Sequence, residues 1–223
     1  MKTASPIRKL LPILLLMSPL LSGAELSTYR GFQFGMSLTA AVKHSGMDKS
    51  EVKTIHQRPA NIQELTWNPA RFSAASKDID PVQQVLFSFY NGQLFRMDIE
   101  YDNQKTEGLS VQDMIEAVSL QYGTASLPAG EIQFPSSSFS ERLTLVARWE
   151  DANASVNLVQ SPYGQRFGLI SFSKHLDSLA QDAVASAVRL DEQEAPQRRK
   201  LEEQNLQEKL DKVRSENKLK FRP

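Results

Sequence analysis

The chain contains no cysteine, which excludes disulfides, thiol catalysis and cysteine-based metal sites. It also lacks an excess of either charge, with 26 basic and 26 acidic residues, and this balance argues against nucleic acid as the main partner. Beyond residue 24 no apolar run reaches the roughly 20 residues that span a bilayer. No HExxH, GxSxG or phosphate-binding glycine motif occurs. These absences favour a domain without a metal or cofactor.

The first 24 residues have the layout of a cleavable signal peptide. Lys2, Arg8 and Lys9 give a positive start, an apolar stretch follows from Leu10 to Leu21, and Ser22-Gly23-Ala24 supplies the small residues before a cut at Glu25. No cysteine follows the apolar stretch, which argues against a lipid-anchored lipoprotein. We therefore expect a periplasmic or secreted protein of 25–223 with no transmembrane segment after cleavage.

A helix-and-strand pattern occurs twice between residues 25 and 175. Gly35-Met36-Ser37 and Gly108-Leu109-Ser110 each precede a helical run, and serine is a favoured N-cap. Each run is followed by a strand that bears tryptophan, then by a hairpin; the first hairpin turns at Asn91-Gly92, a strong hairpin signal. The two copies lie about 70 residues apart, which suggests an internal duplication.

These signals predict an α+β fold of two tandem α-β-β-β units, residues 25–104 and 105–175, which form an antiparallel sheet covered by helices. Strand alternation predicts one apolar sheet face that carries Val85, Phe87, Phe89, Phe95, Met97 and Ile99. On the same strand Asp98 and Glu100 are expected to face solvent beside Arg96. His56 is expected in a polar linker.

Residues 176–223 predict an amphipathic C-terminal helix and a charged tail. Apolar residues recur at helical spacing at Leu176, Leu179, Ala180, Ala183, Val184, Ala187 and Val188, and this stripe should pack on the domain. After Asp191 the apolar residues become sparse, and Pro196 should kink or restart the helix. The tail is either frayed or helical. If helical, its apolar stripe is too thin for a self-standing coiled coil, and it docks on a partner or reaches toward the peptidoglycan or membrane surface.

The run Phe32-x-x-Gly35-Met36-Ser37 with Val42, and more weakly Gly108-Leu109-Ser110 with Ile115, resembles two families of tandem or single helix-plus-sheet units. These are the secreted β-lactamase inhibitor proteins and the outer-membrane assembly lipoprotein BamE (SmpA). The chain departs from both in having no cysteine. It is also similar to an uncharacterised family of exported bacterial proteins that share the run from Tyr29 to Ser37 and a charged tail. These resemblances imply a fold, and any function taken from them is analogy.

Aromatic and arginine side chains near strand ends and loops are the candidates for partner binding, since Trp, Tyr and Arg dominate interface energetics. They are Trp67, Arg71, Phe72, Tyr101, Trp149 and Tyr163. Core packing is the competing interpretation for both tryptophans. We predict a non-catalytic exported protein-binding or envelope-assembly module, without cofactor. The alternatives are a hydrolase with its site in loops 68–81 and 124–140, and a structural envelope protein that acts through the charged helix.

Overall fold

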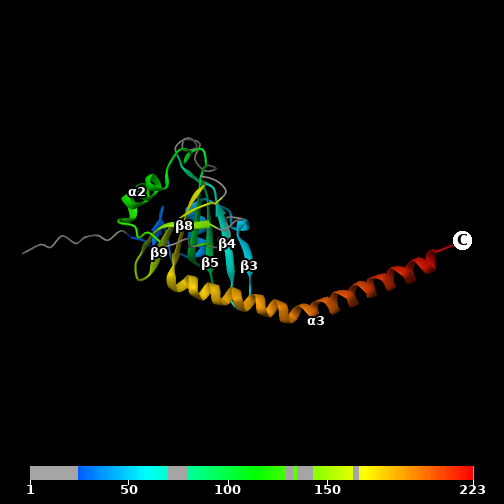
Figure 1. Ribbon diagram of the computed structural model, residues 1–223. Coiled ribbons are helices and arrows are strands. Elements are labelled where there is room, and N and C mark those ends of the chain that lie inside the picture. Colours follow the sequence, from blue (N-terminus) through cyan, green and yellow to red (C-terminus); the bar gives the residue numbers. More distant parts are fainter. Residues whose placement is uncertain (1–24, 70–79, 129–132, 135–142, 163–165, 223) are drawn as a thin grey trace, which may run out of the picture.

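A computed structural model describes residues 25–69, 80–128, 133–134, 143–162 and 166–222. The expected signal peptide, Arg71, Phe72, Tyr163 and most of the two loops proposed for a hydrolase lie outside these residues. The fold is α+β, with one large antiparallel sheet and a long C-terminal helix (Figure 1). Among the described residues, no helix has the length and apolar character needed to cross a bilayer.

In the described part of the chain the sheet has eight strands in the order β3-β4-β5-β6-β10-β9-β8-β7, and every neighbouring pair is antiparallel. Strands β6 and β10 meet in the middle, where Leu169 pairs with Ile99. The strands are β3 Lys53–His56, β4 Ile62–Trp67, β5 Val82–Tyr90, β6 Gln93–Tyr101, β7 Gln133–Phe134, β8 Leu143–Glu150, β9 Ala154–Gln160 and β10 Phe167–Ser173. A separate small hairpin joins β1 Thr28–Tyr29 to β2 Phe32–Gln33.

The local signals in the sequence act as predicted. Helix α1 Leu38–Ser45 begins after Ser37, whose hydroxyl accepts a hydrogen bond from the Ala40 amide at 3.2 Å. Helix α2 Val111–Tyr122 begins after Ser110, which forms a reciprocal capping box with Asp113. The turn between β5 and β6 places Asn91 and Gly92 at φ 48° and 78°, a region that only a few residue types tolerate.

Helices α1 and α2 pack on one face of the sheet, which we call the first face. The largest buried cluster lies there and includes residues of both helices and of both halves of the sheet, among them Ala41, Val118, Phe87 and Leu158. Val85, Phe87, Phe89, Met97 and Ile99 belong to this cluster, as the strand alternation predicted. Trp67 and Trp149 lie on β4 and β8, and both contact the same cluster.

The prediction for Phe95 is wrong. The β5–β6 pairing shifts register between Ser88 and Phe89, so two residues of β6 stand where one is expected and the alternation is broken. Leu94 therefore lies in the first-face cluster, whereas Phe95 packs with Ile62 and Ala180 on the opposite, second face. This bulge supplies an apolar contact for the C-terminal helix.

Helix α3 Lys174–Lys220 is 47 residues long, which corresponds to about 70 Å. Its first half packs on the second face through Ala180, Ala183 and Ala187, whereas Leu179 and Val188 of the predicted stripe are 37% and 46% exposed. Figure 1 shows the helix running past β5, β4 and β3, bending in its orange part, and continuing away from the globular body. Pro196 lies inside the helix. Because proline has no backbone N–H to donate, it favours such a bend.

Candidate functional site

A cavity of about 620 Å³ lies between α3 and the second face of the sheet, and we call it the α3 cavity. A volume of this size is ordinary for a small-molecule site. Side chains from four strands and from α3 line it: Ile55, His56, Ile62, Glu64, Ser88, Phe95, Arg96, Asp177, Ala180, Gln181, Val184 and Ala185. Both the sheet and α3 contribute apolar and charged side chains to this lining.

Arg96, which lines the cavity, forms a buried ion pair with Asp98. Both follow the same face of β6, and the guanidinium donates from Nε to Asp98 Oδ1 at 2.7 Å and from Nη2 to Oδ2 at 3.3 Å. The Asp98 side chain is only 1% exposed and that of Arg96 13%. The prediction that Asp98 faces solvent is therefore wrong, because α3 and its neighbours cover this face.

Two further carboxylates face the same cavity from opposite sides. Asp177 is buried in the first turn of α3, and its Oδ2 accepts a hydrogen bond from Gln181 at 2.5 Å. Burial raises the pKa of Asp177, although the attraction of Arg96 opposes the rise. Burial and the negative charge of Asp98 raise the pKa of Glu64, on β4. Burial disfavours the charge of Arg96, but the surrounding carboxylates outweigh it and raise the pKa of Arg96.

A serine hydroxyl also lines the cavity. Ser88 lies on β5, between Glu64 on β4 and Arg96 on β6, which are its register partners. Its side chain lines the cavity and the residue is 5% exposed. A hydroxyl in this position can both donate to and accept from a ligand or an ordered water in the cavity.

His56 was missed by the sequence reasoning, which expected it in a polar linker. It ends β3 and lines the α3 cavity beside Ile55. The other two histidines lie elsewhere: His44 packs edge-on against Phe32 and contacts the Arg30 carbonyl at 3.1 Å, and His175 is exposed near the start of α3. Within the described ranges, no group of three or more His, Asp or Glu side chains is arranged to hold a metal ion.

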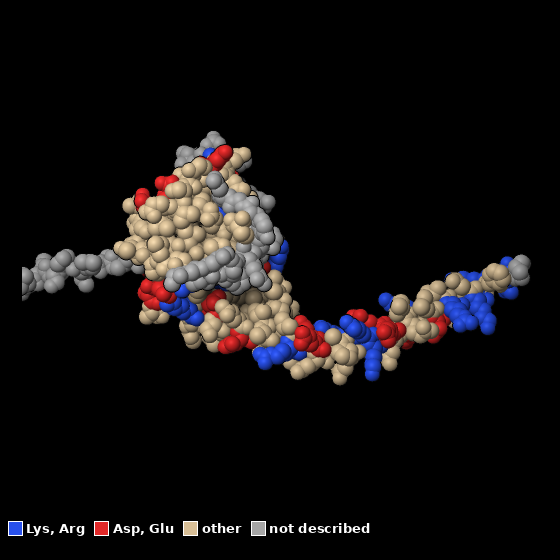
Figure 2. Space-filling model, viewed as in Figure 1, with Lys and Arg blue, Asp and Glu red and all other residues tan. Residues whose placement is uncertain are grey.

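The second half of α3 is a separate candidate surface, which we call the arm (residues 196–222). Every residue of the arm is exposed. Leu206, Leu210 and Val213 lie at i, i+4 and i+7, so they share one side of the helix, and they are 59%, 55% and 54% exposed. Figure 2 shows that Lys and Arg gather toward the far end of this helix.

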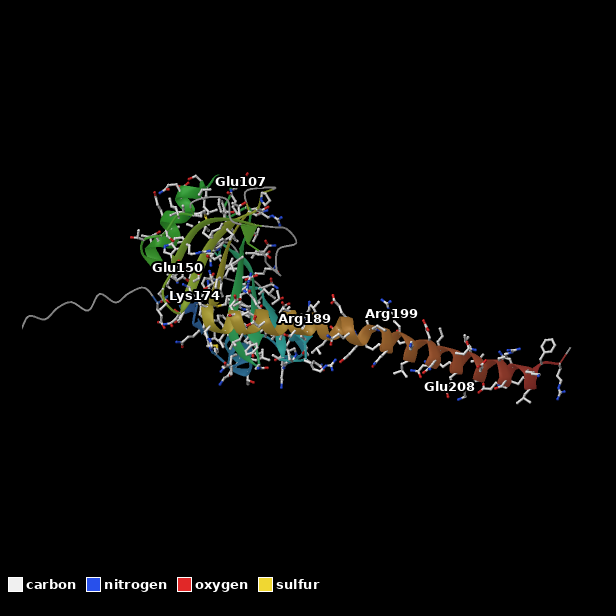
Figure 3. The ribbon with its side chains drawn as sticks, turned by 60° about the horizontal axis from the view of Figure 1, so that its bottom comes forward. Glu107, Glu150, Lys174, Arg189, Arg199 and Glu208 are labelled. Atoms are coloured by element: carbon white, nitrogen blue, oxygen red, sulfur yellow. The ribbon has the colours of Figure 1, made fainter. Side chains whose placement is uncertain are left out.

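The base of α3 is fixed to the body at both ends of its packed half. At the start, Lys174 Nζ donates to Glu150 Oε2 at 2.8 Å, and Figure 3 shows these two side chains together. Near the end of the packed half, before α3 extends away from the body, Arg58 makes two hydrogen bonds to the carboxylate of Glu194, at 3.1 and 2.8 Å. In Figure 3 Arg199 and Glu208 lie beyond this point, on the part of the helix outside the body.

The structure brings three of the sequence-predicted partner residues into the first-face cluster. Trp149 is 2% exposed and donates its indole N–H to the Gly123 carbonyl at 2.9 Å. Trp67 is half-buried and stacks on Phe87 with ring centroids 6.2 Å apart. Tyr101 lines a small cavity with Tyr29 and Tyr122. Whether any of the six predicted residues contacts a partner stays a prediction.

Comparison with protein-family models, with curated proteins and with solved structures gives no match for this chain.

Proposed function

We propose that the protein is a non-catalytic binding module that holds a protein partner on the apolar side of the arm. The observation that carries this proposal is the row of Leu206, Leu210 and Val213. These side chains are exposed on the part of α3 that extends away from the globular body. Apolar residues at i, i+4 and i+7 are the anchors by which an amphipathic helix enters the groove of another protein.

The energetics of an isolated helix support a role for a partner. Residues 196–220 would span about 38 Å, and most helices obtain their stability from packing of an apolar face rather than from intrinsic propensity. The arm receives no such packing from its own domain. A partner that covers Leu206, Leu210 and Val213 would supply it.

Charge defines the chemistry of that partner. Residues 209–222 contain six basic and two acidic side chains, and on an ideal helix Lys209 and Arg214 flank the apolar row. The complementary surface is an apolar groove with an acidic rim, because opposite charges around an interface speed association and exclude wrong partners. The buried contacts of Ala180, Ala183 and Ala187 support the role of the body as a base for the arm, and the exposed ion pairs at Lys174 and Arg58 add to them.

We further infer that the protein works outside the cytoplasm, where residues 1–24 would direct it. We also infer that the body arose by duplication. The strand order is symmetric about the β6–β10 pair, and serine caps at Ser37 and Ser110 precede the two short helices. Trp67 and Trp149 occupy equivalent strands on the first face. These correspondences support two tandem units with a helical extension.

A matched pair of variants tests the binding proposal. The triple variant Leu206→Gln, Leu210→Gln, Val213→Gln removes the apolar row, and glutamine keeps helix propensity close to that of leucine. The control Glu208→Gln, Lys212→Gln changes the opposite side and preserves net charge. Complexes formed in extracts of the native host are compared by affinity purification after circular dichroism has shown equal helix content.

The proposal expects one partner to be retained by the wild type and the control and lost by the triple variant. If the triple variant retains the same partners as the control, the apolar row does not bind a protein. If the triple variant no longer associates with membranes but still forms the same protein complexes, the result would instead favour an envelope-surface role for the helix.

A further inference from the structure

The α3 cavity combines features that the arm does not explain. Its apolar lining includes Ile62 and Phe95, which are 5% and 6% exposed, together with Val184 of α3. Its polar lining includes Glu64 and Ser88 of the sheet and Asp177 of α3. A ligand that contacts both kinds of side chain must be amphipathic.

The charge balance of the cavity selects the sign of that ligand. Asp98 engages the guanidinium of Arg96 through two hydrogen bonds, so this cation and this anion largely compensate each other. Glu64 and Asp177 are two further carboxylates near the single guanidinium of Arg96, and His56 also lines the cavity. Burial disfavours the ionised form of both carboxyls more than Arg96 favours it, and it raises the pKa of each. A bound cation would relieve that cost, whereas a bound anion would increase it.

The hydrogen-bonding groups select donors. Carboxylates accept hydrogen bonds only, and the Ser88 hydroxyl can accept as well as donate. An ammonium or guanidinium offers several N–H donors to such a set, and hydrogen bonds between ionised groups are the stronger ones. A neutral apolar molecule would fill the volume but offer no hydrogen-bond donor to these acceptors.

We propose that the α3 cavity binds a small organic cation, an amine or guanidinium carried on an apolar body, with its head at Glu64, Ser88 and Asp177. The apolar body lies against Ile62, Phe95 and Val184. This inference is independent of the proposed partner of the arm, because it uses only residues on the packed half of α3 and on β4 to β6.

The test uses isothermal titration calorimetry of the full chain with 2-phenylethylamine as the probe. Its neutral and anionic relatives, 2-phenylethanol and 3-phenylpropanoate, serve as ligand controls. Glu64→Gln and Asp177→Asn remove one charge each with little change of shape. Ala185→Leu narrows the cavity from an exposed helical position and leaves every charge in place.

We expect saturable binding of the amine at one site, no measurable binding of the carboxylate, and at least a tenfold loss of amine affinity in Glu64→Gln and in Asp177→Asn. Ala185→Leu should weaken binding as well. Absence of amine binding at concentrations up to about 10 mM would overturn the proposal, because even a Kd of that size corresponds to a binding free energy of only a few kcal/mol. So would equal binding of the amine and the carboxylate, or unchanged affinity in both charge variants of proven fold.

Discussion

Replacing Asp98 with alanine probes the buried charge on the second face. The substitution removes the carboxylate that accepts two hydrogen bonds from Arg96, whose side chain is only 13% exposed. Breaking a buried ion pair from one side costs about 3–5 kcal/mol, because the remaining charge stays desolvated. Against a typical total stability of 5–15 kcal/mol, this is a large loss.

An exposed ion pair in the same protein provides the control. Glu150 and Lys174 lie 2.8 Å apart, but their side chains are 43% and 36% exposed. Pairs of this kind contribute about 1 kcal/mol or less. Glu150→Ala should therefore leave the free energy of unfolding nearly unchanged.

Urea unfolding followed by circular dichroism at neutral pH measures both losses. The double variant Arg96→Met, Asp98→Leu should be more stable than Asp98→Ala, since it removes both members of the pair and does not leave the Arg96 guanidinium buried without Asp98. A cost below about 1 kcal/mol for Asp98→Ala, equal to that of Glu150→Ala, would show that this face is open to solvent and that α3 does not cover it.

Three further predictions concern the same elements. Phe95→Ala should destabilise the protein by about 3–5 kcal/mol in urea unfolding, because it removes a buried ring from the contact with α3. Burial and then the charge of Asp98 raise the pKa of Glu64, so ionisation of this carboxyl opposes folding as pH rises through the raised pKa. Glu64→Gln should thus raise thermal stability at about pH 7 and not at about pH 3, where both states are protonated. Ser110→Ala should cost about 1 kcal/mol by loss of the α2 cap.

The features that depend on neighbours in sequence were predictable. Serine caps, the Asn91-Gly92 turn and the alanine-rich spacing of Ala180, Ala183 and Ala187 each specify local geometry, and each forms as expected. The bulge beside Ser88 was not predictable from alternation, because alternation assumes an unbroken strand.

The α3 cavity was not predictable because its residues come from distant parts of the chain. Glu64, Arg96 and Asp177 carry no spacing signal, and only the docking of α3 brings them together. The same docking buries Asp98, which resembles a solvent-facing charge when β6 is considered alone. The edge strands β3 and β7 are short and were missed for lack of an alternating pattern.

Site-specific photocrosslinking in the native host tests the central claim, that one side of the arm holds a protein. A photoreactive amino acid is placed in turn at Leu206, Leu210 and Val213, and for comparison at Glu208 and Ser215 on the opposite side. We expect one protein adduct of the same mass from the first three positions and none from the other two. Adducts of equal yield from both sides, or no adduct from the apolar row, would contradict it.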